Sequence, residues 1–137
     1  MKARSLAYWI TTLVFALAIL ASGIADLVHA PAIVEGIGQL GYPLYLVTLL
    51  GVWKLLGVAA ILAPGTPRLK EWAYAGLFFE LTGAAFSHVA AGVGSPAAAL
   101  ALTGLAAASW ALRPGDRRVP GPLALGPAPR PLTVAPG

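Results

Sequence analysis

Residues 44–63 have the sequence LYLVTLLGVWKLLGVAAILA, an apolar run in which Lys54 is the only charged residue. At about 1.5 Å per residue, a helix of this length crosses the ~30 Å hydrocarbon core of a bilayer. Proline and glycine lie on both sides of the run, in residues 41–43 and 64–67, and they favour turns over a continued helix. The run therefore predicts a transmembrane helix with one charge near its middle.

Three further apolar runs have the same character, at residues 6–28, 72–91 and 96–112. Together the four runs predict an all-α, four-helix transmembrane bundle within residues 1–113. The composition agrees, because 58% of the residues are hydrophobic and only 10% are charged, whereas a soluble domain has roughly 25% charged residues. Residues 114–137 are rich in proline and glycine, and we expect them to form a disordered cytoplasmic tail.

The basic residues predict the orientation of these helices. Eight of the nine Lys and Arg residues, all except Lys54, lie at the two ends of the chain or between the second and third runs. The connections at residues 30–43 and 92–96 contain none. Under the positive-inside rule, this distribution predicts a multi-pass protein of the cell membrane with both termini in the cytoplasm. Trp9, Trp72 and Trp110 fall on the same predicted side, as interfacial aromatic residues do.

The composition and motifs also exclude several classes of chemistry. The chain has no cysteine, which excludes disulfides, thiol catalysis and cysteine-ligated metals. Its net positive charge forms no dense basic stripe interleaved with aromatic residues, so we do not expect nucleic-acid binding. There is no phosphate loop, Rossmann fingerprint or nucleophile elbow.

Lys54 and Glu80 are the most costly residues in the predicted bundle, because a charge at the bilayer centre costs about 2.5–3.5 kcal/mol. Each lies roughly 12–14 Å from the inner end of its helix. A short connection joins the two helices, so we predict antiparallel neighbours with a Lys54–Glu80 ion pair, which serves either function or helix register. Gly76, Gly83 and Ser87 share the helix face of Glu80, which predicts close approach of another helix there.

A second polar cluster is expected nearer the outer side. Ser22, Asp26 and His29 share a face of the first run, and His88 lies at a comparable height in the third. We expect Asp26, His29 and His88 to converge, with Glu35 covering them. The alternatives are a helix end wetted by lipid headgroups at Asp26 and His29, and a neutral, carbonyl-bonded imidazole at His88.

Motifs occur in order in five short segments, at residues 22–26, 41–45, 50–57, 67–76 and 83–88. The most specific are GVWKLLG at residues 51–57 and KEWAYAG at residues 70–76. Over about residues 5–112 this order resembles the DoxX-like family of small four-span membrane proteins. The resemblance implies a four-helix membrane bundle. The wider DoxX family includes the small subunit of a terminal quinol oxidase, and its recurring polar positions correspond here to Asp26, Lys54, Glu80 and His88.

We therefore predict a small subunit or partner in quinone-linked membrane redox metabolism, with quinone as the ligand and a membrane oxidoreductase as the partner. A homo-oligomer is a further option, and no metal is expected. The predicted acid–base residues are Asp26, Glu80 and His88. The predicted ligand contacts are Lys54, Trp53, Ser87, Tyr45 and His29.

Several alternatives remain open from the sequence. The first is a stand-alone membrane enzyme of the isomerase, cyclase or epoxide hydrolase type, which would use the same acid–base residues on a lipid-soluble substrate. The second is a proton or solute pathway between the two polar clusters. The third is a haem held by His29 and His88, or a metal ion held by these histidines and Asp26.

Overall fold

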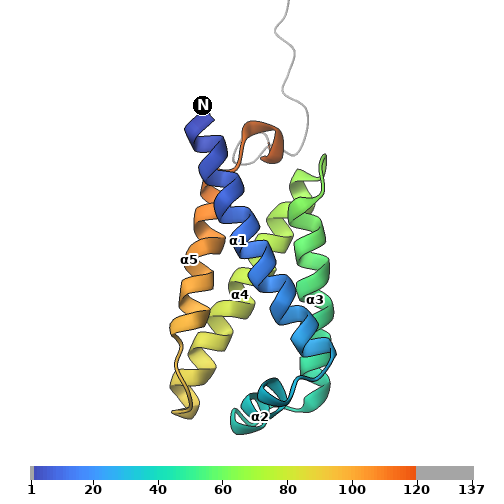
Figure 1. The fold of residues 1–137 in the computed structure, drawn as a ribbon, viewed down its shortest axis with the longest axis vertical. Coiled ribbons are helices and arrows are strands. Elements are labelled where there is room, and N and C mark those ends of the chain that lie inside the picture. Colours follow the sequence, from blue (N-terminus) through green and yellow to red (C-terminus); the bar gives the residue numbers. More distant parts are fainter. Residues whose placement is uncertain (1, 120–137) are drawn as a thin grey trace, which may run out of the picture.

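The computed structural model describes residues 2–119, and all regular secondary structure in this range is helical (Figure 1). The elements are α1 (Lys2–Leu27), α2 (Pro31–Gln39), α3 (Leu44–Leu62), α4 (Pro67–Ala91), α5 (Ala97–Leu112) and the single 3-10 turn η1 (Gly115–Arg117). The predicted all-α class is therefore confirmed for the described residues. Most of the predicted tail, from residue 120 onward, lies outside them; its first residues include η1.

The four long helices form a ring. Helices α1 and α4 each pack against α3 and α5, whereas α2 packs against α3. Figure 1 shows the long helices running along the molecule, with α2 lying across the end opposite the N-terminus. Buried apolar side chains from all four helices fill the interior, among them Phe15 on α1, Ile61 on α3, Leu77 on α4 and Ala106 on α5.

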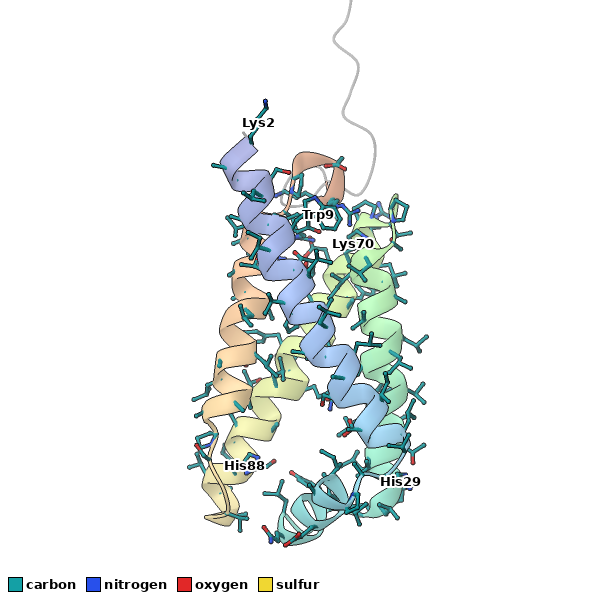
Figure 2. All side chains as sticks on the ribbon, viewed as in Figure 1. Lys2, Trp9, His29, Lys70 and His88 are labelled. Atoms are coloured by element: carbon teal, nitrogen blue, oxygen red, sulfur yellow. The ribbon has the colours of Figure 1, made fainter. Side chains whose placement is uncertain are left out.

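Both ends of the described chain lie at one end of the ring, where Figure 2 also shows Lys2 and Lys70. Arg4 Nη2 donates to the carbonyl of Ala111 at 3.2 Å, and Arg117 Nη1 donates to that of Ile61 at 3.3 Å. We call this the basic end, defined by Arg4, Lys70, Arg113, Arg117 and Arg118. Basic residues from separate segments of the sequence thus gather at one end of the bundle.

Lys70 fixes the turn between α3 and α4 at the basic end. Its side chain is fully buried, and its ammonium donates to the carbonyls of Ala60, at 2.9 Å, and Ala63. Ala60 lies in the last turn of α3 and Ala63 is its C-cap, where a helix leaves acceptors without intrahelical partners and its dipole favours a cation. Burial, followed by the charges of Arg117 and Arg113, lowers the pKa of Lys70. The contact explains why this lysine is buried although it lies among the basic residues between two predicted apolar runs.

Helices α1 and α3 approach closely at two glycines. A Cβ atom on Gly51 would lie 3.0 Å from the carbonyl oxygen of Gly23 and 2.9 Å from the side chain of Leu27. By contrast, a Cβ on Gly76 or Gly83 would meet nothing within 4 Å. The predicted close approach of another helix at Gly76 and Gly83 is therefore wrong, because both glycines are exposed. The close crossing lies between α1 and α3 instead.

Two helix boundaries differ from the sequence prediction. Helix α4 begins at Pro67 rather than Trp72, with proline in its first turn, so the charged residues 68–71 form helix rather than loop. Residues 31–39, predicted as a connection, form α2, which also begins with a proline. Both segments are short or polar and lack the long apolar run used to predict helices, but each has a proline suited to a first helical turn.

The outer surface of the ring is strongly apolar. Phe79 and Phe86 on α4 are 71% and 73% exposed, and Leu17 on α1 is 64% exposed. Exposed apolar surface of this kind is unfavourable in water and marks a membrane or protein contact. Helices α1 and α3 are each long and apolar enough to cross a membrane. The other two predicted spans are weaker: Glu80 and His88 interrupt the apolar character of α4, and α5 has only 16 residues.

Candidate functional site

Lys54 lies at the centre of a buried polar cluster. Its Nζ is 2.6 Å from Asp26 Oδ2 and 3.2 Å from Glu80 Oε1, and it also donates to Ser22 Oγ at 3.0 Å. The predicted Lys54–Glu80 ion pair is therefore confirmed. Asp26 was expected elsewhere, in the outer cluster, and its place beside Lys54 is new. We call Asp26, Lys54 and Glu80 the charged triad.

Three helices supply the triad, and the ammonium connects them. Ser22 and Asp26 lie one turn apart on α1, so both face α3 at the Gly23–Gly51 crossing. Glu80 reaches Lys54 from α4, on the other side of α3. Because α1 and α4 each pack against α3 and α5, they occupy opposite corners of the ring. Lys54 thus joins two helices at opposite corners.

The triad is largely shielded from solvent. The side chains of Lys54, Asp26 and Glu80 are 11%, 6% and 14% exposed. Burying ionised groups costs several kcal/mol each unless partners compensate for the lost hydration. With all three ionised, one ammonium faces two carboxylates, a net charge of 1 − 2 = −1. A single added proton makes the cluster neutral, so the geometry suits a site that holds or passes one proton.

The predicted convergence of Asp26, His29 and His88 is wrong. His29 lies beyond the end of α1, with a left-handed φ of 50°, and its Nε2 is 2.8 Å from Thr48 Oγ1. His88 Nδ1 donates to the carbonyl of Val93 at 2.8 Å, which is the simpler role considered for it. Figure 2 shows the two histidines on opposite sides of the end of the bundle. Within residues 2–119, no three His, Asp or Glu side chains are placed to hold a metal ion.

The other predicted ligand contacts do not join the triad. Trp53 and Tyr45 are 54% and 74% exposed, so they present their rings to the surroundings of the bundle. Ser87 Oγ lies 2.8 Å from the hydroxyl of Tyr42, in the connection between α2 and α3. Glu35, expected to cover the outer cluster, is an exposed residue of α2 that accepts from Gln39 at 3.3 Å.

Comparison with known protein families identifies the family of this chain. The DoxX-like family model matches residues 10–112. The chain belongs to the DoxX-like family. No curated protein and no solved structure matches it. The matched range contains the whole charged triad, and membership supports a membrane protein of the DoxX type.

This DoxX-like chain has a second polar layer that the sequence analysis missed. Ser109 Oγ on α5 lies 2.6 Å from Thr12 Oγ1 on α1 and 2.7 Å from the hydroxyl of Tyr74 on α4. Thr12 and Ser109 are fully buried and Tyr74 is 4% exposed. The layer is neutral and its hydroxyls satisfy one another, so it fits a structural role better than proton chemistry. In the sequence this layer appears only as single hydroxyl residues within apolar runs, and these indicate a buried polar contact less clearly than a charged residue does.

Proposed function

We propose that this DoxX-like protein crosses the cell membrane four times, with both termini in the cytoplasm. The concentration of arginine and lysine at the basic end supports this orientation, because cytoplasmic segments carry an excess of basic residues. The apolar outer surface supports contact of the whole ring with lipid. With four helices crossing, the triad would lie within the hydrocarbon layer.

The absence of cysteine makes this topology directly testable. Ser5→Cys and Ser95→Cys each add one thiol at an exposed serine near opposite ends of the bundle. In intact cells, a membrane-impermeant maleimide should label Ser95→Cys, and should label Ser5→Cys only after the membrane is permeabilised. Labelling of both positions in intact cells, or the reverse pattern, would contradict the proposal.

We infer that the charged triad handles protons in quinone-linked membrane redox metabolism, with this chain as a small subunit or partner of an oxidoreductase. The supporting observation is the buried ammonium between two carboxylates, which one proton makes neutral. Reduction of a quinone to a quinol takes two electrons and two protons. The partner enzyme would supply the electrons. Glu80 or Asp26 would pass protons, and Lys54 would donate a hydrogen bond to a quinone carbonyl.

The test is purification of the full chain in native lipid particles, followed by mass spectrometry of the bound small molecules and proteins. We expect a quinone in near-equimolar amount with the wild type, together with an oxidoreductase subunit. Glu80→Gln should lose the quinone, because it removes the proton-binding carboxylate next to Lys54. Glu35→Gln is the matched control, since this glutamate is exposed and bonds to Gln39.

The same experiment separates this function from the enzyme alternative. If the protein is instead an acid–base enzyme, Asp26 and Glu80, on either side of Lys54, remain the candidate acid and base. His88 does not, because its ring bonds to the carbonyl of Val93. The enzyme alternative would be supported if the wild type bound and consumed a lipid-soluble compound other than a quinone, and if Glu80→Gln did not consume that compound. Quinone absent from the wild type, or retained equally by Glu80→Gln and Glu35→Gln, would contradict the redox proposal.

A further inference from the structure

A cavity of about 760 Å³ opens at the basic end. Three arginines line it, from the start of α1 and from the segment after α5: Arg4, Arg113 and Arg118. Glu71 contributes the one carboxylate. The lining therefore carries a net charge of 3 − 1 = +2. We call this cavity the arginine pocket.

Backbone carbonyls and Glu71 hold these arginines in place. Arg118 donates from Nε to the carbonyl of Arg113 and from Nη2 to that of Ala111, both at 2.6 Å, and Arg4 donates to the latter carbonyl as well. Both carboxylate oxygens of Glu71 are occupied, Oε1 by Arg113 at 2.6 Å and Oε2 by the indole N–H of Trp110 at 2.8 Å. The charge of Glu71 is thus compensated by Arg113, which leaves the positive charge of Arg4 and Arg118 without a carboxylate partner among the pocket residues.

Arg113 is the most constrained of the three. It is 3% exposed, and its guanidinium carbon lies 5.2 Å and 5.4 Å from the ring centres of Tyr74 and Trp110. Its Nη1 is buried and has no hydrogen-bond acceptor among residues 2–119. A buried donor without a partner is uncommon in folded proteins. Arg113 therefore forms part of the wall of the pocket, and the guanidinium groups of Arg4 and Arg118 carry its uncompensated positive charge.

An apolar groove of about 380 Å³ adjoins the arginine pocket between α4 and α5. Ala75, Phe78 and Phe79 line its α4 side, and Ala106 and Ala107 its α5 side. Glu71 and Trp110 line both the groove and the pocket, so the two form one continuous surface. A cationic pocket at the head of an apolar groove matches a molecule with an anionic head and a hydrocarbon tail.

We propose that the arginine pocket and the groove together bind one anionic phospholipid, with its phosphate on the arginines and an acyl chain along α4 and α5. A zwitterionic lipid fits less well, because both oxygens of Glu71 are already paired and the pocket offers its ammonium no other carboxylate. A quinone has no anion for the arginines. The proposal rests on the membrane placement of the basic end but not on the quinone role, so either can fail without the other.

The test is native mass spectrometry of the full chain in detergent with equal amounts of dioleoyl phosphatidylglycerol and dioleoyl phosphatidylcholine. Since each basic residue near an anionic lipid contributes about 1 kcal/mol, the two uncompensated arginines should favour phosphatidylglycerol by about tenfold or more. The double variant Arg4→Gln/Arg118→Gln should bind the two lipids nearly equally. Arg68→Gln is the control, because it removes an exposed positive charge that does not line the pocket.

Two further arms identify the source of the anion and the use of the groove. Inorganic phosphate at millimolar concentration should not displace phosphatidylglycerol, and displacement would identify a free-phosphate site instead. Ala107→Trp, which fills the groove without changing charge, should lower phosphatidylglycerol binding severalfold. Equal binding of both lipids by the wild type, or no effect of Ala107→Trp, would overturn the proposal. Size-exclusion profiles like that of the wild type would show that the variants are folded.

Discussion

Replacing Lys54 with methionine should lower the free energy of unfolding by about 3–5 kcal/mol, because it removes the cation from a buried ion pair and leaves two carboxylates without it. Asp26 and Glu80 are 6% and 14% exposed, so water screens their mutual repulsion poorly. The ammonium also connects α1 to α4 through α3. The measurement is an unfolding titration with sodium dodecyl sulfate in mixed micelles, followed by tryptophan fluorescence.

The triple variant Lys54→Met/Asp26→Asn/Glu80→Gln is the matched control. It removes every charge of the triad at nearly constant side-chain volume, so it should recover most of the stability lost by Lys54→Met. Recovery would assign the loss to uncompensated carboxylates rather than to altered packing. A single variant within about 1 kcal/mol of the wild type would contradict this account of the triad.

Replacing Gly51 with leucine should cost about 3 kcal/mol, at the upper end of the usual range for overpacking. The first added carbon would lie 3.0 Å from the backbone oxygen of Gly23 and 2.9 Å from Leu27, and the rest of the side chain needs more room. Helices α1 and α3 would have to separate, which would also draw Asp26 away from Lys54. The same titration measures the loss.

Gly83→Leu is the control for this prediction, because it makes the same chemical change on α4, where an added Cβ meets nothing within 4 Å. It should be neutral or slightly stabilising, since glycine is an unfavourable residue in a helix interior. Equal losses at the two positions would show that glycine flexibility, and not the crossing of α1 and α3, determines the effect.

The pairing of Lys54 with Glu80 was predictable because α3 and α4 are consecutive antiparallel helices. The residue count behind the prediction was nevertheless too short on α4, because it began at Trp72 whereas α4 begins at Pro67. The contact between Lys54 and Glu80 therefore depends on the packing of the two helices as well as on their order. Asp26 was misplaced because its height was counted from a different starting point, at the N-terminal end of α1. This count assumes parallel axes and aligned helix ends, whereas α1 begins at Lys2 and meets α3 closely at Gly23 and Gly51.

The histidines were misplaced for a local reason. The predicted helical face of Ser22 and Asp26 extended as far as His29, but α1 ends at Leu27 and His29 takes a left-handed backbone conformation. His88 lies near the end of α4, where the chain turns back and brings the carbonyl of Val93 within reach of its ring. Helix ends depend on a few backbone angles, and apolar periodicity does not predict these.

The helical class, the family, the basic end and the costly charges within apolar runs were all predictable from composition and residue order along the chain. The partners of those charges depend instead on tertiary packing. Asp26 joins Lys54 because two glycines let α1 and α3 cross closely, and the arginine pocket forms because α1 and the segment after α5 meet at one end. Such contacts depend on how helices distant in sequence are tilted and offset, and side-chain packing sets those quantities only once the bundle has assembled.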